Sequence, residues 1–141
     1  MLSTDQDTVE PAPAVPGPLR LLLVEDEPDI RRLLRIYLER VPGLRIIGEA
    51  ADGAEALRAA TALEPNVVVL DLTMPVMDGT AVLPRIRSRL PDAAIVVFSA
   101  YLSLLAERSL AELGADAIIS KAQPLSVLKT AILAAWALRD G

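Results

Sequence analysis

The amino-acid sequence predicts an open, doubly wound α/β fold in which five parallel strands form one sheet. Five short apolar runs alternate along the chain with five segments whose apolar residues recur at helical spacing. A helix between two strands acts as a crossover connection, and such connections join parallel strands. Right-handed crossovers place helices on both faces of the sheet. The run Val67–Leu70, three valines and a leucine, is typical of a strand covered on both faces.

Each predicted element has its own boundary signals. The first strand, Leu21–Val24, ends at three acidic residues, and Pro28 opens the first helix because proline suits the first helical turn. That helix carries apolar residues at helical spacing through Leu38 and is broken by Pro42-Gly43. The remaining predicted elements are strand 44–50, helix 54–63, strand 67–70, helix 80–90, strand 94–99, helix 102–113 ended by Gly114, strand 117–120 and helix 124–138.

Length and composition indicate one domain behind a short leader. The 141 residues fit a single domain, and 52% of them are hydrophobic, which is ample for one core. Residues 1–18 combine acidic residues with four prolines and are expected to form a disordered leader, either a plain solvated tail or a docking peptide. The domain itself is then expected at residues 19–141.

The composition also excludes several kinds of site. The chain has no Cys and no His, so disulfides, thiolate or histidine metal ligands and Ser-His-Asp catalysis are ruled out. A net charge of −5 repels phosphate backbones, so no direct nucleic-acid binding is expected. The longest apolar run, Ala131–Leu138, is too short to cross a bilayer, and no signal-peptide pattern opens the chain. We therefore expect a cytoplasmic protein that does not enter membranes.

Side chains able to do chemistry follow four of the predicted strands. They are Glu25, Asp26 and Glu27 after the first strand, Asp71 after the third, Ser99 ending the fourth and Lys121 following the fifth. Ligands of a doubly wound sheet bind at the carboxyl ends of its strands, where the strand order reverses. Clustered carboxylates repel one another, and oxygen donors without His or Cys favour a hard cation such as Mg²⁺. A cation, an ammonium and a hydroxyl together suit a phosphoryl group, with a carboxylate as its acceptor.

These residues lie in four motifs that resemble the receiver domain of two-component response regulators. The motifs are LLVEDEP at residues 22–28, DLTMPVMDG at 71–79, FSA at 98–100 and GADAIISK at 114–121. The resemblance covers the whole chain after the leader. It implies the five-stranded (βα)5 flavodoxin-like receiver fold and a role as a switch in phosphorelay signalling.

The resemblance implies a role for each matching residue. Asp71 would be the phosphoacceptor, Ser99 the hydroxyl donor and Lys121 the lysine beside the phosphoryl group. Mg²⁺ would be held by Asp26, Asp71, the backbone carbonyl of Thr73 and, through water, Glu25. The phosphoryl donor would be a sensor histidine kinase or a histidine phosphotransfer protein. Slow self-dephosphorylation would make the chain a switch rather than a conventional enzyme.

Two other functions are weighed against this hypothesis. A phosphatase with an aspartate nucleophile needs a second acid two residues after that nucleophile, where this chain has Thr73. A pseudo-receiver, which acts as an interaction module without phosphorylation, usually lacks the acceptor, an acid or the lysine, and this chain keeps all of them. One departure from the family is Ile118, at a position where receivers often carry an aromatic switch residue. Tyr101 could supply that aromatic signal instead.

The first and last helices carry more apolar residues than one buried face needs. In the last helix, Val127, Ala131, Ala134 and Leu138 lie outside the main apolar stripe, and Ile36 lies outside the stripe of the first helix. An exposed apolar patch indicates a partner. We expect these two helices to form a homodimer or docking surface, the alternative being an alanine-rich surface without a partner.

Overall fold

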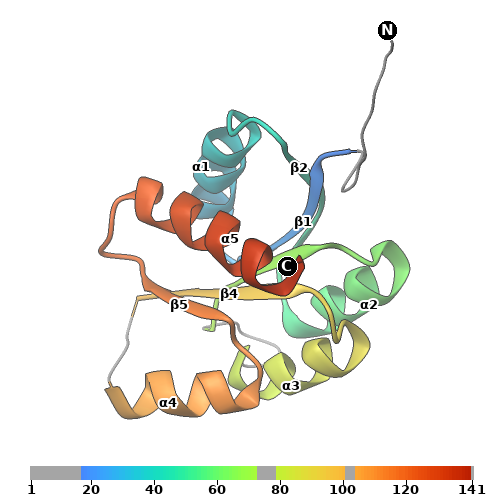
Figure 1. The fold of residues 1–141 in the computed structure, drawn as a ribbon, viewed down its shortest axis with the longest axis vertical. Coiled ribbons are helices and arrows are strands. Elements are labelled where there is room, and N and C mark those ends of the chain that lie inside the picture. Colours follow the sequence, from blue (N-terminus) through green and yellow to red (C-terminus); the bar gives the residue numbers. More distant parts are fainter. Residues whose placement is uncertain (1–16, 73–78, 101–103, 141) are drawn as a thin grey trace, which may run out of the picture.

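The structure, a computed structural model, describes residues 17–72, 79–100 and 104–140 of the chain. Strands and helices alternate along these residues (Figure 1). The strands are β1 (Leu19–Val24), β2 (Leu44–Ala50), β3 (Val67–Leu70), β4 (Ala94–Ser99) and β5 (Ala117–Ser120). The helices are α1 (Pro28–Glu39), α2 (Gly53–Leu63), α3 (Gly79–Arg89), α4 (Leu104–Leu113) and α5 (Leu125–Asp140). Most of the leader expected at residues 1–18 lies outside the described residues.

The five strands form one parallel sheet in the order β2-β1-β3-β4-β5. The chain moves from β1 to one side to form β2, and then returns past β1 to form β3 on the other side. The strand order therefore reverses between β1 and β3, which places the crevice expected for a ligand at their carboxyl ends. The predicted doubly wound fold is confirmed.

Helices cover both faces of the sheet (Figure 1). Alternate side chains of a strand point to opposite faces, so Leu21 and Leu23 of β1 pack on one side, and Leu22 and Val24 on the other. The first pair belongs to a core cluster with residues of α1 and α5, and the second to a cluster with residues of α2, α3 and α4. Both faces of β3 are buried, as the run of valines predicts.

The observed boundaries differ from the predicted ones by up to two residues where both are described. Strand β1 begins two residues early because Leu19 and Arg20 pair with Leu44 and Arg45 of β2. Helix α2 begins at Gly53 because the carboxylate of Asp52 accepts a hydrogen bond from the Glu55 N–H at 2.8 Å. Among the described residues, no helix combines the length and apolar character needed to cross a bilayer.

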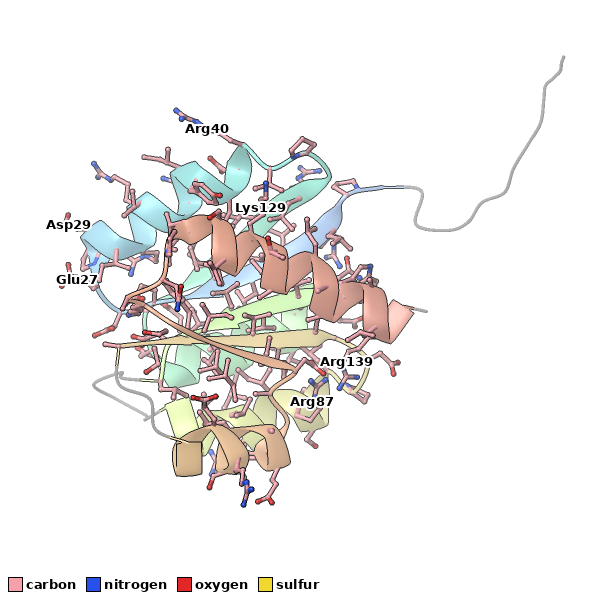
Figure 2. The ribbon with its side chains drawn as sticks, turned by 60° about the vertical axis from the view of Figure 1, so that its left-hand side comes forward. Glu27, Asp29, Arg40, Arg87, Lys129 and Arg139 are labelled. Atoms are coloured by element: carbon pink, nitrogen blue, oxygen red, sulfur yellow. The ribbon has the colours of Figure 1, made fainter. Side chains whose placement is uncertain are left out.

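Arg87 of α3 connects several segments at the amino-terminal edge of β4 and β5. Its guanidinium donates hydrogen bonds to the carbonyls of Leu90, Ala93 and Gly114 at 2.7–3.1 Å. It also forms an ion pair of 2.6 Å with Asp116, whose other carboxylate oxygen pairs with Arg139 of α5 at 2.8 Å. Figure 2 shows Arg87 and Arg139 in the same part of the molecule. A single side chain thus holds the ends of α3 and α4 and the start of two strands.

Replacing Arg87 with alanine is expected to lower the free energy of unfolding by about 2 kcal/mol, because several carbonyls lose a hydrogen-bond donor together and Asp116 loses one of its two arginine partners. Urea denaturation followed by circular dichroism measures this change. Arg85→Ala removes an equally charged but exposed side chain of the same helix and should change stability by no more than about 0.5 kcal/mol. Equal effects of the two variants would contradict a connecting role for Arg87.

Candidate functional site

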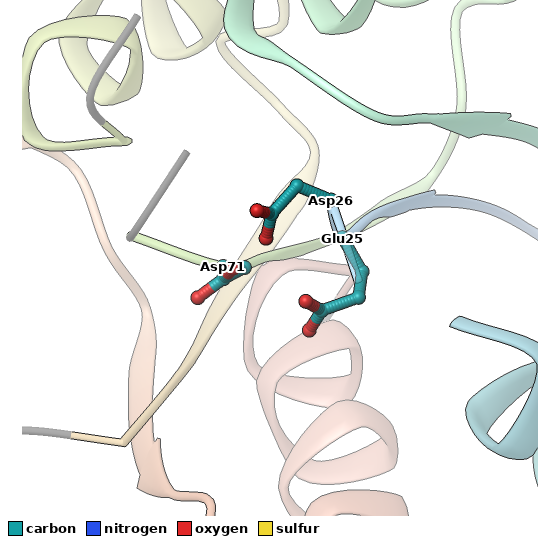
Figure 3. Close-up of side chains that lie close together, drawn as sticks. All are labelled: Glu25, Asp26 and Asp71. Carbon is teal, nitrogen blue, oxygen red and sulfur yellow. The ribbon is translucent and has the colours of Figure 1, made fainter. Parts of the chain in front are cut away.

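Three carboxylates meet where β1 and β3 end. The backbone N–H of Asp71 donates to the carbonyl of Val24 at 3.0 Å, and this contact sets the first residues beyond the two strands side by side. One carboxylate oxygen from each of Glu25, Asp26 and Asp71 lies within 4.8 Å of the others (Figure 3). The sequence predicts this convergence, and it falls at the point where the strand order reverses.

Burial makes this cluster costly without a positive charge. Glu25 is 1% exposed and Asp71 is 3% exposed, whereas Asp26 is only half-buried. Charged carboxylates lose hydration when they are buried and also repel one another. A cation among them is therefore strongly favoured.

Lys121 supplies one positive charge from the end of β5. Its Nζ lies 2.8 Å from Oε1 of Glu25 and 3.4 Å from Oδ1 of Asp71. The backbone N–H of Lys121 donates to the carbonyl of Ser99 at 2.8 Å, which fixes the start of this lysine's side chain beside β4. The ammonium thus links two of the three acids, from a position 50 residues further along the chain than Asp71.

The surroundings of Lys121 favour its charged form. Burial by itself lowers the pKa of Lys121, but the hydrogen bond to Glu25 and the charges of Glu25 and Asp71 outweigh burial and raise the pKa above 10.5. Because the pKa is raised on folding, the stability that this charge contributes is fully present below pH of about 10.5. It is lost as the pH rises through the raised value.

Ser99 is buried at the last position of β4, in register with Ser120 of β5. Since β4 lies between β3 and β5, Ser99 belongs to the strand that separates Asp71 from Lys121. The structure therefore brings five of the predicted residues to one edge of the sheet. Glu25, Asp26, Asp71 and Lys121 form one cluster, and Ser99 ends the strand between Asp71 and Lys121. Thr73 and Tyr101 lie outside the described residues.

The donor set of this cluster fits a divalent cation such as Mg²⁺. Three carboxylates from two loops offer hard oxygen ligands within one small volume, and Asp26 keeps part of its surface open to solvent. Mg²⁺ takes one or two protein carboxylates and keeps several waters, which suits a half-open acidic pocket. The residues present at the cluster therefore fit the ion.

Two features of this region lie beyond the sequence prediction. The carboxylate of Glu25 is paired directly with Lys121 and also accepts a hydrogen bond from the N–H of Glu27 at 3.2 Å. Arg31 of α1 donates a hydrogen bond of 2.8 Å to the backbone carbonyl of Glu25. The only local signal for Arg31 is its place one turn into the helix that follows the acidic loop.

Ile118, at the position where an aromatic residue is common, is half-buried on β5. It lines a hollow of about 440 Å³ together with Ala100 after β4, Glu107 of α4 and Gln123 between β5 and α5. The side chain also packs against the core cluster beneath α2, α3 and α4. A change of conformation at Ile118 would thus alter both the packing of the core and the shape of the hollow at the surface.

Comparison with known proteins identifies the family to which this chain is similar. The family described as the response regulator receiver domain matches residues 21–133. A protein-glutamate methylesterase/protein-glutamine glutaminase of Myxococcus xanthus (strain DK1622) is 41% identical over 77% of this chain, and the match spans 30% of that relative. The transcriptional regulatory protein LiaR of Bacillus subtilis (strain 168) is 34% identical over 83% of this chain and 56% of its own length.

Solved structures that resemble this chain also include receiver domains of response regulators. A two-component response regulator of the LuxR family from Aurantimonas sp. SI85-9A1 superposes with a TM-score of 0.82 and 33% identity, over 88% of this chain and 89% of that one. The signal receiver domain of a NarL regulator from Mycobacterium tuberculosis has a TM-score of 0.73 and 30% identity, over 82% and 98% of the two chains. The chain thus spans nearly all of an isolated domain, but only about a third to a half of the curated relatives named above.

Proposed function

This chain belongs to the response regulator receiver domain family, and on that premise we propose that Asp71 accepts a phosphoryl group in a Mg²⁺-dependent reaction. The donor is a sensor histidine kinase or a histidine phosphotransfer protein in the cytoplasm, and the phosphorylated chain changes conformation to control a partner or an output domain. The observation that carries this proposal is the buried Asp71 carboxylate, held beside two further acids and an ammonium at the switch point of the sheet.

Each step of the transfer uses a group at this site. An oxygen of the Asp71 carboxylate attacks the phosphorus of a phosphohistidine on the donor protein. The new P–O bond forms as the P–N bond breaks, and the imidazole leaves with the electron pair of that bond. The chain has no His, so the phosphohistidine must belong to another protein.

The neighbouring residues stabilise the charge that gathers on the phosphoryl oxygens. Lys121, already between Glu25 and Asp71, pairs with one oxygen, and Ser99 donates a hydrogen bond to another. Asp26, Asp71, the carbonyl of Thr73 and, through water, Glu25 would hold the metal ion. When bound, Mg²⁺ neutralises negative charge on the acceptor and on the phosphoryl group.

Intact-mass measurement tests this proposal directly. After incubation with acetyl phosphate and Mg²⁺, the chain should gain about 80 Da, the mass of one phosphoryl group. The gain should disappear when EDTA replaces Mg²⁺ and when hydroxylamine, which cleaves acyl phosphates, is added afterwards. No gain from acetyl phosphate or from a purified histidine phosphotransfer donor would contradict the proposal and favour a phosphorylation-independent interaction module.

The exposed apolar side chains of α1 and α5 support a homodimer. Leu33 and Ile36 of α1 are 56% and 45% exposed, and Leu133 and Leu138 of α5 are 39% and 85% exposed. Both helices cover the same face of the sheet. Light scattering on a sizing column should give twice the monomer mass, and Ile36→Asp with Leu133→Asp should restore the monomer. A wild-type monomer, with and without phosphorylation, would contradict the dimer.

A further inference from the structure

The backbone on both sides of the Glu25 Cα atom is held by hydrogen bonds. The N–H of Glu25 donates to the carbonyl of Ala50 in β2 at 3.0 Å, and its own carbonyl accepts from Nη1 of Arg31 at 2.8 Å. Because a peptide unit is planar, fixing the carbonyl of Glu25 also fixes the N–Cα bond of Asp26. The point from which the Asp26 side chain leaves the backbone therefore depends on what holds that carbonyl.

Arg31 is itself held in place at both of its ends. Its backbone N–H donates to the carbonyl of Glu27 at 2.9 Å, and its Nε donates to Oε1 of Glu49 at 3.2 Å. The second oxygen of Glu49 pairs with Nε of Arg35 at 2.9 Å. With its side chain 23% exposed, the Arg31 guanidinium is oriented by β2 on one side and directed at the acidic loop on the other.

We propose that Arg31 is a positioning residue for the metal site: it holds the Glu25–Asp26 peptide so that the Asp26 carboxylate faces Asp71. Arg31 touches neither the acceptor nor the ion in this role. The inference rests on the proposed function, since it concerns Mg²⁺ binding at the same cluster.

Simple electrostatics and positioning predict opposite signs for the loss of Arg31. A guanidinium near a divalent-cation site repels the ion, so removing it as a mere charge would tighten Mg²⁺ binding. Loss of a residue that orients a metal ligand weakens binding, typically 10–100-fold. The direction of the change in affinity thus separates the two roles.

Calorimetric titration with Mg²⁺ alone tests this inference. Arg31→Ala should bind Mg²⁺ about 10-fold more weakly than the wild type, and Arg31→Lys, which keeps the charge but loses the planar fork, should also bind more weakly. Arg35→Ala is the matched control: it removes the same charge and a partner of the same Glu49, one helical turn further from Glu25. Its affinity should equal or slightly exceed that of the wild type.

Amide hydrogen exchange in the metal-free proteins gives a second readout. Exchange at residues 25–27 should be faster in Arg31→Ala than in Arg35→Ala. Unchanged or tighter Mg²⁺ binding by Arg31→Ala, or equal weakening by Arg35→Ala, would overturn the positioning role while leaving the proposed function intact. A wild-type chain that binds no Mg²⁺ would overturn the metal-dependent function itself, and this inference with it.

Discussion

Asparagine in place of Asp71 is expected to abolish the mass gain from acetyl phosphate completely. The amide has nearly the shape of the carboxylate but lacks its negative charge and nucleophilic oxygen, so no acyl phosphate can form. Asp71 is buried at the end of β3 and also contributes an oxygen to the acidic cluster. The same substitution should therefore weaken Mg²⁺ binding as well.

Intact mass after incubation with acetyl phosphate and Mg²⁺ measures this result. Asp29→Asn makes the same chemical change at an exposed position in the first turn of α1 and should keep the full gain. A persistent gain of about 80 Da in the Asp71→Asn chain would move the acceptor to another carboxylate, with Asp26 as the first candidate to examine.

Methionine in place of Lys121 is expected to lower the free energy of unfolding by about 3 kcal/mol in the absence of divalent cations. The substitution keeps an unbranched chain of similar length but leaves Glu25 and Asp71 without the ammonium between them. Removing one partner of a buried ion pair costs about 3–5 kcal/mol, because the remaining charge stays buried without compensation. Mg²⁺ should recover part of this loss, since the ion binds the folded state and restores a positive charge there.

Urea denaturation with and without Mg²⁺ measures both effects. Lys129→Met removes an ammonium from the partly exposed side of α5 and should change stability by no more than about 0.5 kcal/mol. If Lys121→Met were as stable as the wild type in EDTA, the ammonium would not be compensating the two acids. If Lys121→Met lowered the free energy of unfolding by the same amount with and without Mg²⁺, the cluster would not be the site where the ion binds.

The fold could be predicted from the sequence because the patterns that indicate its strands and helices are local. Each strand contains a short apolar stretch and is followed by a turn and a helical pattern, so the order and type of the elements could be predicted. The two extra residues of β1 could not, because Leu19 and Arg20 are strand residues only through their pairing with β2. Their own sequence, Leu-Arg directly after Pro18, carries no strand signal of its own.

Part of the candidate site could also be predicted from the sequence. Residues that directly follow parallel strands meet at one edge, so the convergence of Asp71 with Glu25, Asp26 and Lys121 could be predicted from their positions alone. The pairing of Lys121 with Glu25 depends on side-chain conformations that no spacing rule supplies. The contacts of Arg87 outside the site were still harder to predict, since its acceptors at Gly114 and Asp116 lie far along the chain.

The strand order also bears on how the chain assembles as it leaves the ribosome. Strand β1 emerges first, β2 and β3 then add to its two sides, and β4 and β5 follow in turn at the edge beyond β3. None of these five strands has to insert between two that are already paired. The nascent domain can thus grow outward in the order of its synthesis, and the edge that ends in Lys121 completes the acidic pocket last.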